Sequence, residues 1–313
     1  MRVLVTGGLG FLGRAVAIEL LAHGHEVDLL TRGNRPVPPP DGAKVVEADL
    51  LDRDAIRQVV REGQYEGVCH LAALTRVRDS FEQPLTYYDV NVGGTLNLLH
   101  ALAETDPPAP VRLVYTSTNA VYGTREGRLT EDMEPHPESP YAASKLAAEH
   151  LIGYHAAAGA LAAVTLRCFN IAGAVDGYGD NDPTRLIPNV LRAAAGKLPH
   201  LTVNGDGSAV REYVHVADVA SACRLALEKA TPGHDIYNIG TGEGLSINDI
   251  IEATERVTGR PVRVMNGPAK SEPHTLVADS SRAQQVLDWR PAKSSVGTIV
   301  EDAWSATRAI MLL

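Results

Sequence analysis

Tyr141 and Lys145 are the residues whose types and spacing could carry out proton-transfer chemistry. They lie in an alanine-rich segment, Tyr-Ala-Ala-Ser-Lys, which Ser139 and Pro140 open with a helix cap and a first-turn proline. Residues four apart share one face of a helix, so the phenol and the ammonium face the same neighbours. A tyrosine beside a cation can serve as a general acid and base, but such pairs also occur on solvated helices. The pair therefore needs a cofactor site beside it.

The N-terminal glycine pattern predicts such a site. A short apolar strand over 2–6 is followed by Gly7-Gly-Leu-Gly10-Phe-Leu-Gly13 and then by a helix-like run over 14–22. Strand, glycine turn and helix in this order are typical of a dinucleotide-binding unit. Glycines let the backbone approach a pyrophosphate, and the helix N-terminus presents free N–H groups to it.

Strand and helix patterns alternate along the chain. Strands are expected at 2–6, 26–30, 44–47, 67–71, 111–116, 163–169 and 235–239, and helix patterns between them include one long amphipathic helix over 84–104. This alternation predicts an α/β fold, a Rossmann doubly wound parallel sheet with a smaller interleaved C-terminal substrate domain. We expect the dinucleotide-binding domain at 1–167 plus about 213–240, and the substrate domain at 168–212 plus 241–313.

Composition narrows the function classes. The 313 residues are 44% hydrophobic with a net charge of −9, which argues against a nucleic-acid or anionic-membrane surface. Neither an apolar stretch of membrane-spanning length nor a leader layout is evident, so a cytoplasmic protein is expected. Cys69, Cys168 and Cys223 and the eleven histidines lack metal-ligand spacing. We expect reduced thiols that fill the core, and no metal.

With the glycine pattern, Ser117-Thr118 and Tyr141-x-x-x-Lys145 in place, the chain resembles the extended short-chain dehydrogenase/reductase family, the NAD-dependent epimerases and dehydratases. The resemblance covers essentially the whole length. Within the family it is greatest to nucleotide-sugar 4-epimerases of the UDP-glucose/UDP-galactose type. It implies NAD as cofactor, a nucleotide-diphosphate sugar as substrate, and a homodimer formed through the helices around 84–104 and 141–155.

The resemblance also implies a role for each matching position. Tyr141 would be the acid and base, Lys145 its activator and a ribose ligand, and Thr118 the hydroxyl that holds the sugar. The dinucleotide would be bound by Gly7, Gly10, Phe11, Leu12, Gly13, Arg32, Asp49, Leu50, Leu71, Ala72, Ala73, Asn91 and Thr116, together with Tyr141 and Lys145. The substrate would be bound by Thr118, Asn170, Arg185, Leu186, Arg211 and Lys270.

The end of the second strand leaves the choice of cofactor open. An NAD-binding unit usually has an acidic residue there for the ribose hydroxyls. This sequence has Thr31-Arg32 instead, and an arginine at that edge could meet the 2′-phosphate of NADP. The alternative of equal weight is that Arg32 stacks beside the adenine or is solvated. NAD is expected, with NADP as the alternative.

The implied reaction is transient oxidation at C4 of the sugar, with the Tyr141 phenolate taking the 4-hydroxyl proton. A free tyrosine has a pKa near 10, so action near pH 7 requires about three units, or roughly 4 kcal/mol. One cation about 5 Å away supplies roughly 3 kcal/mol before desolvation is counted. Lys145 alone is therefore marginal, and the positive oxidised nicotinamide would bring the total within range.

Other reactions of the family are less compatible with the residues after Thr118. Sugar dehydratases carry an Asp-Glu pair there, whereas this chain has Asn119-Ala120, neither of which transfers a proton. Two alternatives to the epimerase remain open: an NADPH-dependent 4-ketoreductase, which Arg32 would favour, and a non-catalytic dinucleotide-binding regulator. A ketoreductase would consume its cofactor, and an epimerase would not.

Overall fold

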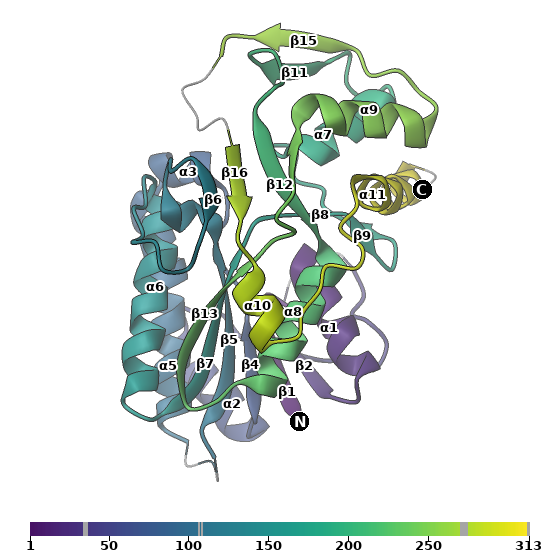
Figure 1. Cartoon of the computed structure of the whole chain (residues 1–313). Helices are drawn as coiled ribbons and strands as arrows, with labels where there is room; N and C mark the ends of the chain where they lie inside the picture. The colour runs from purple at the N-terminus through teal and green to yellow at the C-terminus, as the bar shows by residue number, and fades with distance from the viewer. Residues whose placement is uncertain (34–36, 106, 108, 270–274, 312–313) are drawn as a thin grey trace.

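The computed structural model describes residues 1–33, 37–105, 107, 109–269 and 275–311. Its centre is a seven-stranded sheet in the order β13-β7-β5-β4-β1-β2-β3, in which every neighbouring pair is parallel (Figure 1). The strands are β1 (Arg2–Thr6), β2 (Glu26–Thr31), β3 (Lys44–Glu47), β4 (Gly67–His70), β5 (Val111–Thr118), β7 (Leu161–Cys168) and β13 (Gly233–Ile239). The predicted doubly wound parallel sheet is confirmed.

Helices cover both faces of this sheet. On one face α1 (Phe11–Ala22) and α8 (Val216–Lys229) form a core cluster with β1, β2 and β7. On the other face α2 (Arg53–Gly63), α5 (Gly94–Ala103) and α6 (Pro140–Ala157) form a second cluster. Strands buried on both faces must be apolar along their length, which is why they read as continuous hydrophobic runs in the sequence.

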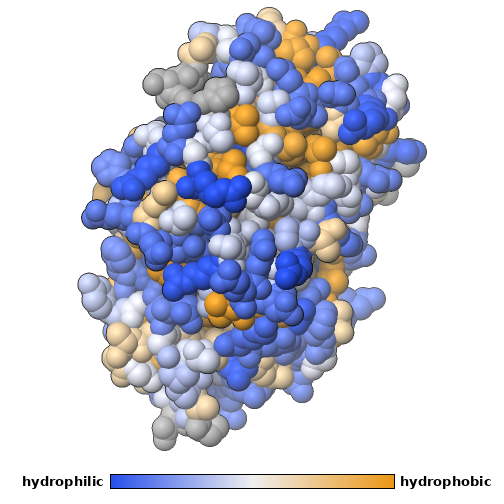
Figure 2. Space-filling view, in the orientation of Figure 1, coloured by the Kyte–Doolittle hydropathy of each residue, from blue (hydrophilic) through white to orange (hydrophobic). Residues whose placement is uncertain are grey.

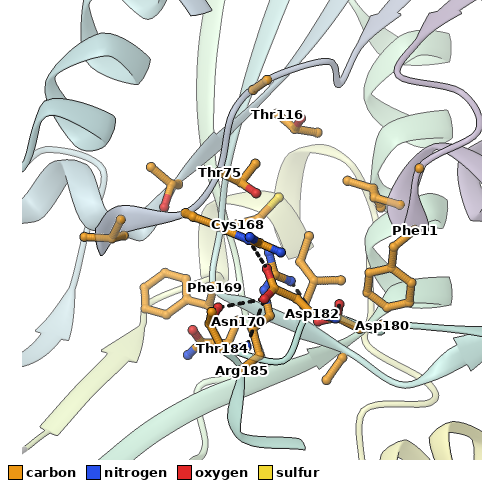
Figure 3. A pocket seen from close by; sticks show the side chains of 18 of the residues that line it. Phe11, Thr75, Thr116, Cys168, Phe169, Asn170, Asp180, Asp182, Thr184 and Arg185 are labelled. Carbon is orange, nitrogen blue, oxygen red and sulfur yellow. Dashed lines mark hydrogen bonds and ion pairs between the residues drawn. The ribbon is translucent and has the colours of Figure 1, made fainter. Parts of the chain in front are cut away.

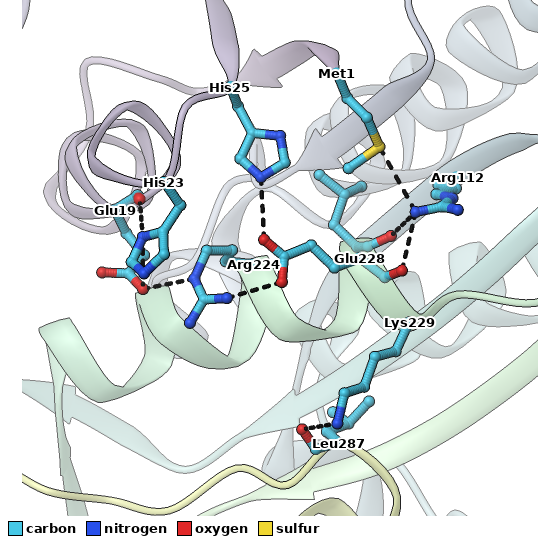
Figure 4. Close-up of polar contacts among 10 residues, drawn as sticks. Met1, Glu19, His23, His25, Arg112, Arg224, Glu228, Lys229 and Leu287 are labelled. Carbon is cyan, nitrogen blue, oxygen red and sulfur yellow. Dashed lines mark hydrogen bonds and ion pairs between the residues drawn. The ribbon is translucent and has the colours of Figure 1, made fainter.

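Ion pairs fasten α1 and the start of β2 to α8 (Figure 4). The Arg224 guanidinium lies 2.8 Å from carboxylate oxygens of both Glu19 and Glu228, and His25 Nε2 lies 3.1 Å from Glu228 Oε1. Arg112 donates a hydrogen bond to the backbone oxygen of Glu228 at 2.9 Å. These contacts include the residue before β2 and so lie at the amino ends of the strands, away from the edge where cofactors bind in such sheets.

The second part of the chain is built from short strands and three helices, α7 (Leu186–Ala194), α9 (Ile247–Thr258) and α11 (Val296–Met311). Their buried residues form a third core cluster. One sheet has the order β14-β12-β16-β6, and β8 also pairs with β12. Its strands are β6 (Gly127–Leu129), β8 (Asn170–Ala172), β12 (Val210–His215), β14 (Gly244–Ser246) and β16 (Thr275–Ala278). Two-stranded sheets are formed by β9 (Ala174–Val175) with β10 (Tyr178–Gly179) and by β11 (Leu201–Asn204) with β15 (Val264–Gly267).

The division into two interleaved domains stays a prediction, and the packing supports it. The third core cluster draws its residues from 172–304. By contrast, α8 packs on the parallel sheet and β13 is one of its strands, as expected for the segment 213–240. Two elements cross the expected boundaries, because β6 pairs with β16 and α10 (Ser281–Val286) contributes Ala283 to the first cluster. Arg14 of α1 joins the two parts through an ion pair with Asp176 at 2.9 Å.

The long helix predicted over 84–104 is present, and it contains a π-helical turn. It consists of α4 (Pro84–Tyr88), the π-helical turn η1 (Asp89–Gly93) and α5, and is preceded by α3 (Val77–Glu82). Gly93 and Gly94 keep right-handed helical dihedrals, so the chain continues without a break. A π-turn inserts an extra residue and rotates the side chains around it. Here Asn91 is 2% exposed between the loop after β4 and α6.

The surface is mainly polar. In the view of Figure 2, hydrophilic residues cover most of this face and apolar residues gather in small separate groups. None of the helices in the described ranges is long and apolar enough to cross a membrane.

Candidate functional site

A cavity of about 790 Å³ lies where the parallel sheet meets the second part of the chain (Figure 3). Its walls include the residues that follow β1, β4 and β7 and the end of β5. The strand order reverses beside β1 and β4, and ligands of doubly wound sheets bind outside the carboxyl ends of strands at this point. The lining residues predicted from the sequence are Gly7, Gly10, Phe11, Leu12, Gly13, Leu71, Ala72, Ala73, Thr116, Thr118, Tyr141, Lys145, Asn170, Arg185 and Leu186.

The turn from β1 to α1 fits a pyrophosphate. Gly7 has a φ of +67°, and its carbonyl accepts the N–H of Gly10 at 2.9 Å, so the turn is tight. A Cβ placed on Gly13 would lie 2.1 Å from Gly7 O, which excludes any larger residue there without a shift of the backbone. No side chain caps α1 and no acidic residue lies in its first turn. The positive end of the helix is therefore available to a phosphate at the cavity.

Arg32, Asp49 and Leu50 do not line this cavity, although they were predicted to contact the dinucleotide. The parallel register of β1, β2 and β3 places Arg32 and Asp49 along the same sheet edge as Gly7. Both side chains are exposed, and Asp49 accepts the N–H of Leu51. Leu50 is 8% exposed and packs in the second core cluster, so its side chain contributes to stability. Contact of these residues with the adenine end remains a prediction.

Asn91 and Arg211 also lie outside the cavity lining. The Asn91 amide bonds to the N–H and carbonyl of Leu74 at 2.8 and 3.1 Å and to the Ser144 hydroxyl at 2.9 Å. It thus supports the loop after β4 and the helix α6 from beneath, and its contact with the dinucleotide remains a prediction. Arg211 donates to the carbonyl of Val210 at 2.9 Å. Lys270 falls outside the described residues.

Tyr141 and Lys145 lie on α6 as predicted. The Ser139 hydroxyl accepts the N–H of Ala142 at 3.2 Å and so caps the helix. Tyr141 is 8% exposed, and its phenol lies beside the Thr118 hydroxyl at the end of β5. Lys145 is 2% exposed, with Nζ 4.1 Å from the centre of the Tyr115 ring. The structure therefore brings the phenol, the hydroxyl and the ammonium to the cavity that the glycine turn also lines.

Acidic residues accompany the arginines on the substrate side of the cavity (Figure 3). Arg185 Nη1 lies 3.1 Å from Asp180 Oδ2. Arg76, in the loop after β4, lies 3.0 Å from Asp182 and so joins the wall next to the sheet to the wall formed by the second part. The Asn170 amide donates to the Glu212 carbonyl at 2.8 Å, which fixes its orientation.

The matching family model is described as the NAD dependent epimerase/dehydratase family, and it covers residues 3–240. The chain belongs to this family. A UDP-glucose 4-epimerase of Corynebacterium glutamicum is 41% identical over 324 residues, which cover 99% of this chain and 97% of that protein. A second, from Streptomyces lividans, is 40% identical over 318 residues, covering 97% and 95%.

Solved structures of family members agree with the chain over its whole length. The UDP-glucose 4-epimerase from Stenotrophomonas maltophila, with bound NAD and formylated UDP-arabinopyranose, gives a TM-score of 0.92 at 32% identity and covers 100% of this chain and 99% of that one. The enzyme from Thermotoga maritima, with UDP-glucose, gives 0.87 at 27% identity and covers 99% and 100%. The resemblance expected from the motifs is confirmed.

Several cavity residues were not predicted from their types alone. They include Thr75, Arg76, Asp180 and Asp182, whereas Ser117, which also lines the cavity, belongs to the motif with Thr118. The Ser117 hydroxyl is buried and has no hydrogen-bond partner among the described residues, so it is available to a ligand. A signal was present in the glycine- and aspartate-rich run over 173–182, but spacing alone does not say which carboxylates face the cavity. The described residues contain no group of three or more His, Cys, Asp or Glu suited to a metal.

Burial controls the charge states of the Tyr141 and Lys145 pair. It raises the pKa of Tyr141, while the nearby Thr118 hydroxyl and the positive charge of Arg185 lower it. It lowers the pKa of Lys145 to about 7, opposed by the charge of Glu149. In the protein alone the lysine is therefore only partly protonated near neutral pH, in line with the expectation that Lys145 by itself is a marginal activator.

This lowered pKa predicts a pH dependence of stability. Lys145 has a pKa of about 7 when folded and 10.5 as its ordinary value, so the unfolded chain binds more protons between these pH values. Its contribution to the free energy of unfolding should therefore rise with pH, by at most about 1.4 kcal/mol per unit. Denaturant unfolding of cofactor-free Lys145→Met should show a stability advantage over the unmodified protein that shrinks from pH 7 to pH 9.

Lys145→Met must be compared with the unmodified protein because buried cysteines titrate in the same pH range and change the free energy of unfolding in the opposite direction. Burial raises the pKa of Cys69 and Cys168 to about 12, so the unfolded chain loses protons first as the pH rises. The exposed Lys197→Met is the matched control. A constant difference between Lys145→Met and the unmodified protein would contradict the prediction.

Proposed function

We propose that the chain is an NAD-dependent nucleotide-sugar 4-epimerase of the UDP-glucose/UDP-galactose type. The observation that carries the proposal is the placement of the Tyr141 phenol, the Thr118 hydroxyl, Lys145 and the glycine turn in one cavity. Asn119 and Ala120 line the same cavity, so the position after Thr118 offers no second proton-transfer group. Relatives named UDP-glucose 4-epimerase, and those solved with NAD or with UDP-glucose, support the assignment.

In this reaction Tyr141 takes the proton of the sugar 4-hydroxyl as C4 is oxidised, and returns it when C4 is reduced from the opposite face. Thr118 holds the sugar oxygen beside the phenol, and Lys145 favours the phenolate when protonated. Bound NAD supplies reversible acceptance of a hydride, and its phosphates would be held by the turn over 7–13. Arg185 contributes positive charge near the phenol, which also lowers the pKa of Tyr141.

The test is interconversion without added cofactor. The purified protein is incubated separately with UDP-glucose and UDP-galactose, and both sugars are followed by proton NMR. We expect each to give the same equilibrium mixture, with NAD released only after denaturation. An NADPH-dependent ketoreductase would instead consume added NADPH in proportion to product. No conversion by protein that retains NAD would overturn the UDP-glucose/UDP-galactose assignment and point to N-acetylated or uronic sugars.

We also propose that the chain forms a homodimer through α4, α5 and α6. Large apolar side chains are exposed on this set of helices and the adjoining α3: Phe81, Leu85, Tyr88, Leu96 and Tyr154. Leu85 is 78% exposed and Tyr154 is 80% exposed, and apolar side chains in such number mark an interaction surface. A second copy is the occupant that the family resemblance implies.

Light scattering of Leu85→Glu tests this surface. The unmodified protein should have the mass of two chains, and Leu85→Glu should shift it toward 33.4 kDa because a buried carboxylate opposes association. Val286→Glu, at an exposed apolar position on α10, is the matched control and should remain dimeric. A single-chain mass for the unmodified protein would refute the proposal.

A further inference from the structure

A continuous chain of buried side chains links the glycine turn to the helix that carries Tyr141. Its members are Thr6 at the end of β1, His70 at the end of β4, Thr95 in α5, Asn91 in η1 and Ser144 in α6. None of them is more than 2% exposed, and none lines the cavity. They occupy the layer directly beneath the cavity wall, so any effect that they have on the reaction must act through other residues.

Thr6 determines which nitrogen of His70 carries the hydrogen. The Thr6 hydroxyl oxygen accepts the backbone N–H groups of Leu71 and Ala72, each at 3.1 Å. A hydroxyl has two acceptor lone pairs and one hydrogen, so its hydrogen remains for His70 Nδ1 at 2.8 Å. Nδ1 is therefore the acceptor, and the ring is the Nε2–H tautomer.

The same direction continues to Tyr141. His70 Nε2 donates to the Thr95 hydroxyl at 2.9 Å, and Thr95 donates to the Asn91 carbonyl at 2.6 Å. The Asn91 side-chain amide donates to the Ser144 hydroxyl at 2.9 Å, and Ser144 donates to the Tyr141 carbonyl at 2.7 Å. Each hydroxyl donates its single hydrogen to the next acceptor. The whole chain thus has one orientation, which requires a neutral His70.

Surrounding groups keep His70 neutral. Burial, together with the positive charge of Lys145, lowers its pKa to about 3. The Tyr115 ring also lies beside His70, with its centre 5.6 Å from the centre of the imidazole. It offers no acceptor to a proton on Nδ1. A protonated ring would place an Nδ1–H against the hydrogen of Thr6, so the network does not tolerate that state.

We propose that His70 and Thr95 are positioning residues that hold the dinucleotide turn and the Tyr141 helix at a fixed separation. The inference rests on the proposed function and deepens it. Thr6 holds the backbone of Leu71 and Ala72, which line the cofactor side of the cavity, and Ser144 fixes the turn of α6 that carries Tyr141. Proton and hydride transfer must occur in one geometry, and a shift of about 1 Å between the reacting groups costs about 100-fold in rate.

Thr95→Val tests the proposal, because it replaces the hydroxyl with a methyl of the same shape. We expect kcat for interconversion of UDP-sugars to fall about tenfold with KM within twofold, and Thr95→Ser to restore it. The matched control is Thr165→Val. Thr165 is fully buried, and its hydroxyl lies 2.8 Å from His234 Nε2 in a second Thr–His pair, one that is outside the network. Both valine variants should lose similar thermal stability, but only Thr95→Val should lose turnover.

Ser144→Ala provides a second variant should Thr95→Val not fold, since it cuts the last link and should cause a similar loss of kcat. Equal losses of kcat in Thr95→Val and Thr165→Val, or an undiminished kcat in both Thr95→Val and Ser144→Ala, would overturn the proposal. The ¹⁵N spectrum of labelled histidine gives a readout that needs no substrate. His70, assigned by its absence in His70→Gln, should be the Nε2–H tautomer from pH 8 to pH 5, and an Nδ1–H tautomer would refute the network even if the sugar specificity proves different.

Discussion

Tyr141→Phe should lower turnover by roughly 10²- to 10⁴-fold, the usual loss for a general acid and base. Phenylalanine removes only the hydroxyl beside Thr118, and keeps the ring that packs edge-on against Tyr87 at a centre distance of 6.4 Å. The fold and the glycine turn are untouched by this change. Initial rates of sugar interconversion, together with the NAD released on denaturation, are the measurements.

Tyr154→Phe is the control for this substitution. Tyr154 lies on the same helix but outside the cavity, on the surface proposed for the dimer, and phenylalanine keeps its ring there, so loss of its hydroxyl should leave kcat and bound NAD as they are. Undiminished turnover in Tyr141→Phe would remove Tyr141 from the mechanism. Loss of NAD from that variant would instead assign the phenol a role in holding the cofactor.

Gly13→Ala should weaken NAD retention by at least about 100-fold. The added Cβ would lie 2.1 Å from Gly7 O and 2.7 Å from Gly8 Cα. Both are backbone atoms, so no flexible side chain can move aside to make room. The turn must therefore open, which moves the N–H groups that would face the pyrophosphate. Backbone strain of this kind also costs about 1–3 kcal/mol of stability. Dinucleotide content after purification and denaturant unfolding measure the two effects.

Gly297→Ala is the matched control, since Gly297 also lies in the first turn of a helix but has its nearest neighbour, Ser295 Oγ, at 4.0 Å. Alanine there should be neutral or slightly stabilising because it lowers the entropy of the unfolded chain. Full NAD occupancy in Gly13→Ala would mean that the turn does not bind the pyrophosphate.

The charge arithmetic for Tyr141 changes once burial is known. From the sequence, the spacing to Lys145 predicts that the lysine charge stabilises the Tyr141 phenolate by roughly 3 kcal/mol before desolvation is counted. In the structure, desolvation raises the pKa of Tyr141 and lowers that of Lys145 to about 7. Burial of the two groups therefore offsets part of the stabilisation of the phenolate by Lys145. Arg185 was expected to contact substrate, and its charge also acts on the phenol. We therefore expect full activation of the phenol only when the positive oxidised nicotinamide is bound.

Local patterns were sufficient for the parallel sheet, the glycine turn and the Tyr141 helix. Each depends on residues close in sequence: glycines between a strand and a helix, Ser139 and Pro140 at a helix start, and apolar runs long enough for buried strands. The carboxyl ends of parallel strands share one edge, so residues after β1, β4 and β5 were expected together and are found together. Membership of the family follows from the same motifs.

Side-chain direction required the tertiary structure, because it depends on contacts between segments far apart in the chain. Leu50 turns into the core, while Asn91 is carried beneath the cavity by a π-turn that no propensity predicts. The pairing of Arg76 with Asp182 joins residues 106 positions apart across the cavity. The orientation of His70 depends on hydrogen bonds with Thr6 of β1 and Thr95 of α5, which lie 64 and 25 residues away in the sequence, and a spacing rule contains no such information. Packing selects one of the many side-chain arrangements that the local pattern allows.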